Sequence, residues 1–149
     1  MAIWEKLWNK HSERPDWLSY DVMKTPHHCS WRSLSYDSWS ENGEDAKVCE
    51  DARKALSQGR DGAIIIASSN PIKDDNNDPP CIRAKREYNA IADECGGIFK
   101  CVEEHPSEKK SDIMEIEINR NGPKLKSKPM ATATVLGSGA IGSQPLGHG

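Results

Sequence analysis

Two histidines and a cysteine stand side by side at His27-His28-Cys29, and these residue types can bind a metal or act as base and nucleophile. Because adjacent side chains point in different directions, at most two of the three can serve one metal ion without further ligands. The other candidate ligands stand at no recognised ligand spacing: His11, Cys49 and His105. We therefore predict neither a metal centre nor a catalytic site here, and place the histidines on a turn. A small hydrolase or toxin that uses His27 and His28 is the alternative.

The five cysteines are many for a chain of 149 residues, although their density is below that of a disulfide scaffold. No two of them are separated by two residues, so the signature of a zinc ribbon or a thioredoxin-type redox motif is missing. An odd number leaves at least one thiol unpaired or bound to another chain. All five are candidates for disulfide bonds that brace the core: Cys29, Cys49, Cys81, Cys95 and Cys101.

Two further segments resemble ligand-binding motifs but lack essential parts. Residues 137–142, Gly-Ser-Gly-Ala-Ile-Gly, match the G-x-G-x-x-G pattern of dinucleotide-binding units, yet only seven residues follow, too few for the helix and second strand. The acidic segment 74–78 lacks the order of ligands and the central glycine of a calcium loop. We therefore predict no bound cofactor and no metal.

Residues 1–12 are expected to form an amphipathic helix with an apolar face that carries two tryptophans. Membrane-binding helices usually have a strongly basic polar face, whereas the polar residues of this segment carry mixed charges. We expect the apolar face to pack on the domain's own core, or to bind a protein partner or a second copy of the chain. The candidate interaction residues are Trp4, Leu7 and Trp8.

The rest of the chain alternates between helical and extended patterns. A helix is predicted over residues 44–58, followed at once by a buried strand at 63–67, whose five residues are all apolar. A loop at 68–80 leads to a second helix at about 80–94. Alternation of apolar residues with glutamates predicts a half-exposed strand at 113–118.

This order of elements is typical of the α+β class, with amphipathic helices packed on a small antiparallel sheet. We predict a single domain over residues 1–122, which includes a Trp-rich N-terminal segment at 1–43. A tail that contains glycine, serine and lysine follows at 123–149.

Charge and hydropathy exclude several kinds of partner. The formal net charge of −3 gives no general attraction to nucleic acid. No stretch approaches the roughly 18 apolar residues that a membrane-spanning helix needs. We therefore predict a small soluble protein with no nucleic-acid partner and no membrane span. The first residues lack the basic and then apolar pattern of a signal peptide.

Residues 81–122 resemble the cysteine-containing modules of small secreted fungal proteins of the killer-toxin-like and effector type. The resemblance depends on Cys81 and Cys95, which bracket an amphipathic helix, on the Gly96-Gly97 pair that closes it, and on the later strand. Cys49, which opens the preceding helix, is a second possible anchor. The resemblance implies a disulfide-braced α+β sandwich that is exported and works by binding, without an active site. A cytoplasmic location is the alternative.

Three functions follow from these observations. The first is a non-enzymatic binding or toxin-like interaction protein with a cysteine-braced core. The second is a structural or assembly subunit that self-associates through its N-terminal helix and its tail. The third is the small hydrolase or toxin that uses His27 and His28.

Overall fold

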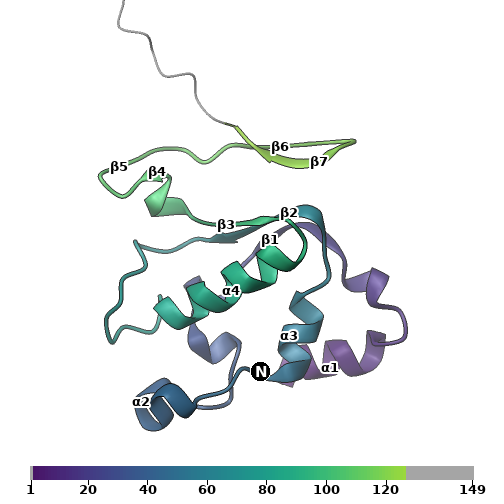
Figure 1. The fold of residues 1–149 in the computed structure, drawn as a ribbon, viewed down its shortest axis with the longest axis vertical. Coiled ribbons are helices and arrows are strands. Elements are labelled where there is room, and N and C mark those ends of the chain that lie inside the picture. Colours follow the sequence, from purple (N-terminus) through teal and green to yellow (C-terminus); the bar gives the residue numbers. More distant parts are fainter. Residues whose placement is uncertain (1, 127–149) are drawn as a thin grey trace, which may run out of the picture.

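The structure, a computed structural model, describes residues 2–126 and is built around one three-stranded sheet (Figure 1). Its strands β1 (Tyr20–Lys24), β2 (Gly59–Ala67) and β3 (Ile98–Cys101) are all parallel and lie in the order β1-β2-β3. Ile65 of β2 pairs with Met23 on one side and with Phe99 on the other. The G-x-G-x-x-G segment and most of the predicted tail lie outside the described residues.

The central strand confirms the strand predicted at 63–67. Ala63, Ile64, Ile65 and Ala67 are each at most 1 % exposed, because β2 has a strand on each edge and packed elements on both faces. The apolar run is therefore the middle of the domain. The strand also begins four residues earlier than predicted, with the polar sequence Gly-Arg-Asp-Gly at its exposed start.

Helices connect the three strands. The chain passes from β1 through α3 (Glu50–Leu56) to β2, and from β2 through α4 (Ile82–Glu94) to β3. Strands joined by such crossovers run parallel, so the expected antiparallel arrangement is wrong for this sheet. The coarser prediction of a small α+β domain is confirmed.

Two antiparallel hairpins follow the sheet: β4 (Pro106–Ser107) with β5 (Lys110–Ser111), and β6 (Ile116–Asn119) with β7 (Gly122–Leu125). The strand expected at 113–118 appears as β6, shifted towards its C-terminal side. Because β7 ends at Leu125, the folded part of the chain continues past residue 122.

The N-terminal part consists of helices and short helical turns around β1. The expected amphipathic helix is α1 (Ala2–His11), and the helix expected at 44–58 is shorter, because only α3 is α-helical there. The remaining elements are α2 (Trp39–Asn42) and the 3-10 turns Pro15–Leu18, Pro26–His28, Trp31–Ser33, Gly43–Asp45 and Val102–Glu104.

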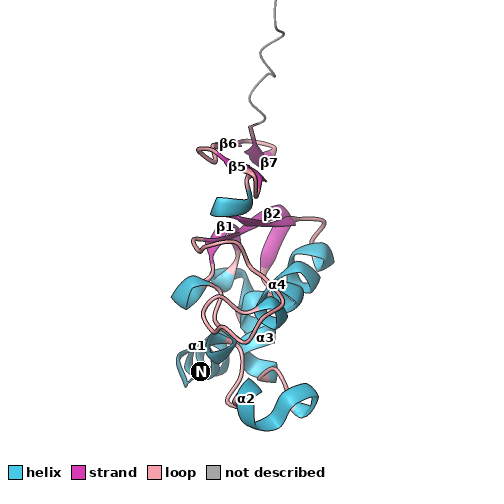
Figure 2. Ribbon diagram, turned by 90° about the vertical axis from the view of Figure 1, so that its left-hand side faces the viewer, coloured by secondary structure: helices cyan, strands magenta, loops and turns pink. Residues whose placement is uncertain are grey.

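The helices and the last hairpin cover opposite faces of the sheet. Figures 1 and 2 show α1, α3 and α4 on one side and the hairpin β6–β7 on the other, where β7 contacts β2. Helix α4 buries Ala84, Tyr88 and Ile91 completely or almost so, and the Tyr88 ring stacks on Phe99 at a centroid distance of 6.3 Å. This contact fixes α4 on β3. Within residues 2–126, no helix combines the length and hydropathy that crossing a bilayer requires.

Gly97 is the residue at which α4 turns directly into β3. A Cβ atom at this position would lie 2.1 Å from the carbonyl oxygen of Ala63, and this neighbour is backbone that cannot move aside. We expect Gly97→Ala to lower the free energy of unfolding by about 3 kcal/mol or more, measured by urea denaturation.

Gly62→Ala is the matched control, because Gly62 has a φ of 72° but open space around its Cβ position. It should cost only about 1 kcal/mol, the usual penalty of a left-handed alanine. Equal losses in the two variants would show that the close approach of Gly97 to β2 is unimportant.

Candidate functional site

The three parallel strands end at the same edge of the sheet, and the loops that follow them surround a cleft of about 400 Å³. We call it the carboxyl-edge cleft. In many open sheets of parallel strands, ligands bind outside the carboxyl ends of the strands, although the order β1-β2-β3 lacks the reversal at which such sites usually form. The residues of the cleft used below come from all three loops: His28, Ser68, Ser69, Pro80, Val102 and Glu103.

A strained turn forms the wall of the cleft after β1. His27, His28 and Cys29 have φ angles of 49°, 56° and 66°, so three successive residues with side chains adopt the left-handed conformation. Each such residue costs about 1–2 kcal/mol, and backbone strain of this kind gathers at functional sites. The histidines lie on a turn as predicted, but the backbone conformation of this turn was not foreseen.

Contacts on both sides hold this turn in place. Thr25 donates its N–H to the carbonyl of Ile66 at 2.8 Å, and Cys81 donates its N–H to the carbonyl of Cys29 at 3.0 Å. The Cys29 side chain is fully buried in the core. The His27 and His28 side chains are exposed, so the core fixes the backbone while the imidazoles stay at the surface.

The ring of His28, a residue that lines the cleft, forms one hydrogen bond to the backbone. Its Nδ1 lies 2.5 Å from the carbonyl oxygen of Ser68. Since a carbonyl only accepts hydrogen bonds, Nδ1 carries the proton, and Nε2 of the neutral ring is an acceptor. The bond also ties the loop after β1 to the loop after β2.

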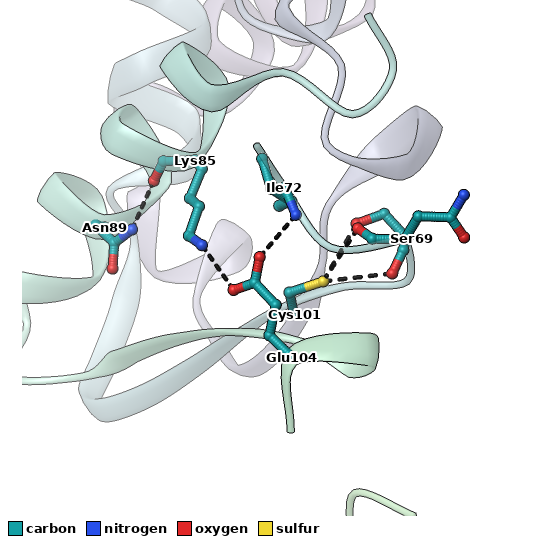
Figure 3. A network of polar contacts seen from close by, with 7 residues as sticks. Ser69, Ile72, Lys85, Asn89, Cys101 and Glu104 are labelled. Carbon is teal, nitrogen blue, oxygen red and sulfur yellow. Dashed lines mark hydrogen bonds and ion pairs between the residues drawn. The ribbon is translucent and has the colours of Figure 1, made fainter. Parts of the chain in front are cut away.

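A polar network supports the loops after β2 and β3 (Figure 3). The Glu104 carboxylate accepts the N–H of Ile72 at 2.7 Å and the ammonium of Lys85 at 2.6 Å. The Cys101 thiol lies 3.3 Å from the carbonyl oxygen of Ser69. Glu104 and Lys85 are 16 % and 24 % exposed, so this ion pair is largely shielded from solvent.

The cysteine beside the histidines is a poor nucleophile. Burial, together with the neighbouring Cys81 and Cys101, raises the pKa of Cys29 to about 12, and the Lys85 ammonium opposes this shift only in part. The thiol therefore stays protonated at neutral pH. His28 contacts a backbone carbonyl and no nucleophile, so the geometry gives the hydrolase interpretation no base–nucleophile pair at this turn.

The five cysteines, all within the described residues, are free thiols in the structure. Cys29, Cys81 and Cys101 are buried, whereas Cys49 and Cys95 are half-buried. A disulfide-braced core stays a prediction.

The acidic loop 74–78 uses its carboxylates within the fold. Asp74 pairs with Arg86 at 3.1 Å, and Asp78 accepts the N–H of Trp31 at 3.0 Å. Asp75 accepts hydrogen bonds from the backbone and side chain of Asn77. Across residues 2–126, no group of three or more His, Cys, Asp or Glu side chains is placed to hold a metal ion.

The predicted interaction residues of α1 lie between the core and the surface. Trp4, Leu7 and Trp8 are each half-buried, and Trp4 packs against the hydrophobic core. Helix α1 lies against α3, and Trp8 lines a second cleft of about 350 Å³ together with Arg53. Part of the apolar face of α1 therefore packs on the domain's own core.

Sequence reasoning missed the cleft residues Ser68, Ser69 and Glu103. The sequence feature that could have indicated Ser68 and Ser69 is their position directly after Ala67, the last residue of the buried strand. A strand end marks a ligand site only when its parallel neighbours are known. Neither β1 nor β3 was foreseen.

The fold and the site define a small α+β domain with a candidate cleft at the carboxyl edge of a parallel sheet. A scan of protein-family models, a search of curated proteins and a search of solved structures each found no match to this chain.

Two adjacent glutamates have different roles at the cleft: Glu104 supports its loops through the ion pair with Lys85, and Glu103 lines it. We expect Glu104→Gln to lower the free energy of unfolding by about 2 kcal/mol, because Lys85 loses a shielded charged partner. Glu103→Gln should change it by less than about 0.5 kcal/mol, since Glu103 is exposed. Urea denaturation measures both, and equal effects would contradict the assignment.

Proposed function

We propose that the protein is a non-enzymatic binding protein that holds a small polar ligand in the carboxyl-edge cleft. The observation that carries this proposal is the meeting of three strand ends around one cleft, with the strained turn 27–29 as part of its wall. A fold maintains such strain only where surrounding contacts over-determine it. The buried Cys29 and the bonds of its neighbours provide those contacts.

The polar groups of the cleft favour a ligand that donates hydrogen bonds. Glu103 offers a carboxylate, His28 offers Nε2 of the neutral ring, and Ser68 offers a hydroxyl. Pro80 and Val102 supply apolar walls, against which a ring can pack. A carboxylate at the rim disfavours anions. We therefore propose a neutral hydroxylated ring compound, a monosaccharide or a nucleoside, as the ligand class.

A panel of neutral monosaccharides and nucleosides, screened by saturation-transfer NMR and quantified by calorimetry, tests this proposal. His28→Ala and Glu103→Gln should each weaken binding of the best compound about tenfold, which is the usual loss for one hydrogen bond to a ligand. Glu108→Gln is the matched control, because Glu108 is an exposed carboxylate outside the cleft, and it should leave the affinity unchanged.

Binding that His28→Ala and Glu103→Gln leave unchanged would place the ligand elsewhere. Failure of every compound in the panel would overturn the proposed ligand class.

Self-association is the second candidate function, and the surface of the N-terminal helices favours it. Ile3 of α1 and Trp17 of the turn Pro15–Leu18 are 65 % and 61 % exposed, and the half-buried Trp8 lines an open cleft nearby on the chain. Large apolar side chains on one short segment are typical of protein interfaces.

Sedimentation velocity across a hundredfold concentration range tests this second candidate. If α1 mediates assembly, the chain should form a dimer or larger species at high concentration, and Ile3→Ser with Trp8→Ala should shift it to a monomer. Ile118→Ser is the control, because Ile118 is similarly exposed, at 63 %, but lies on β6. A monomer throughout the range would exclude assembly through α1.

A further inference from the structure

We propose that Cys29 and Cys81 are an oxidative modification site, at which a peroxide converts the two buried thiols into an intramolecular disulfide bond. The bond would join the strained turn after β1 to the residue that precedes α4. The proposal does not depend on which ligand the carboxyl-edge cleft binds.

A backbone hydrogen bond holds the two cysteines close together. The Cys81 N–H donates to the Cys29 carbonyl at 3.0 Å. Adding the covalent distances on either side of this hydrogen bond limits the separation of the two Cα atoms to about 7 Å. Disulfide bonds span Cα separations of about 4.4–6.8 Å, so the upper limit set by this contact is close to the range that a disulfide bond bridges.

The two side chains also share one environment. Cys29 is 0 % and Cys81 4 % exposed, and both belong to the same buried cluster of the core. The nearby Cys81 also helps to raise the pKa of Cys29. A backbone hydrogen bond and burial in one cluster therefore bring this pair together.

The other three cysteines are less well placed. The thiol of Cys101 is held by the carbonyl oxygens of Ser69 and Asn70, at 3.3 and 3.5 Å. The Cys49 thiol lies 3.9 Å from the Glu5 carboxylate, and the Cys95 thiol lies 3.2 Å from the carbonyl oxygen of Ala92. Of the five, only Cys29 and Cys81 are joined to each other through a hydrogen bond of their backbones.

The carboxyl-edge cleft lies next to the pair in the chain, and we infer that a small oxidant enters there. His28 and Pro80 line the cleft and are the residues directly before Cys29 and Cys81. The Cys81 thiolate attacks one peroxide oxygen, the O–O bond breaks, and the departing hydroxide takes a proton to form water. The protonated Cys29 thiol then attacks the sulfur of the Cys81 sulfenic acid, and its proton leaves with the sulfenic hydroxyl group as a second water. Two thiols and one hydrogen peroxide thus give one disulfide and two waters.

Peptide mapping of the full chain tests the proposal. Reduced protein at low micromolar concentration is treated with hydrogen peroxide and then with catalase, unfolded in acid, alkylated with N-ethylmaleimide and digested with trypsin. A lysine or arginine separates every two successive cysteines, so each cysteine falls in its own tryptic peptide. The expected product links peptide 25–32 to peptide 74–83, exceeds every other linked pair at least fivefold, and disappears on reduction.

Recovery of Cys29 and Cys81 as alkylated thiols, while other cysteines are oxidised, would overturn the proposal. A dominant link from Cys29 to Cys101 would overturn the assigned pair. In Cys81→Ser, Cys29 should remain unlinked, whereas Cys101→Ser, the control for loss of another buried thiol, should keep the full yield of the link. Should Cys81→Ser fail to fold, the mapping of the wild-type chain still decides the question.

Discussion

The parallel pairing of β1 and β3 with β2 is the constraint on which the rest of the structure depends. Parallel strands cannot be joined by tight turns, so each pair requires a crossover, and here α3 and α4 supply the two crossovers. The helices must then bury an apolar face on the sheet, which accounts for the buried Ala84, Tyr88 and Ile91 of α4. The same alignment directs all three carboxyl ends to one edge, where the cleft forms.

The strained turn at this edge shows how the core fixes a surface site. A left-handed residue with a side chain is unfavourable, and three in succession require strong local contacts. The apolar Cys29 side chain lies fully inside the core, while the bonds of Thr25 and Cys81 hold the backbone on either side. The imidazole of His28 consequently lies beside the cleft, with Nδ1 bonded to the carbonyl of Ser68.

The sequence was sufficient to predict the elements with strong local patterns. The five apolar residues of 63–67 and the regular apolar spacing over 80–94 lie in β2 and α4, because buried position and hydrophobic periodicity coincide there. Strand β1, Tyr-Asp-Val-Met-Lys, is an edge strand with no buried residue, so its sequence carries little of the usual strand signal. Strand β3 has only four residues and directly follows a helix and two glycines.

The candidate site was harder to predict than the fold, because it depends on how strands pair. His28, Ser68 and Glu103 are 35 or more residues apart in sequence, and only the order β1-β2-β3 brings their loops together. Without β1 and β3, the sheet was expected to be antiparallel, and an antiparallel sheet has no common carboxyl edge. The left-handed turn at His27, His28 and Cys29 was hidden for another reason, since none of its residues is the glycine that normally marks such a conformation.

The proposed disulfide and the proposed ligand would act on the same two walls of the cleft, which connects them thermodynamically. His28 and Pro80 contact the cleft, and Cys29 and Cys81 directly follow them in the chain. If closing the disulfide changes the affinity of the ligand by some factor, the bound ligand must change the equilibrium constant for disulfide formation by the same factor.

The sign of this coupling depends on the separation of the two walls of the cleft. A ligand that fits the present separation favours the disulfide if the bond preserves that separation. The same ligand opposes the disulfide if the bond draws the walls together. Because the strained turn and the start of α4 already share a backbone hydrogen bond, closing the disulfide needs little movement of either wall. The coupling between the two events should therefore be small and favourable.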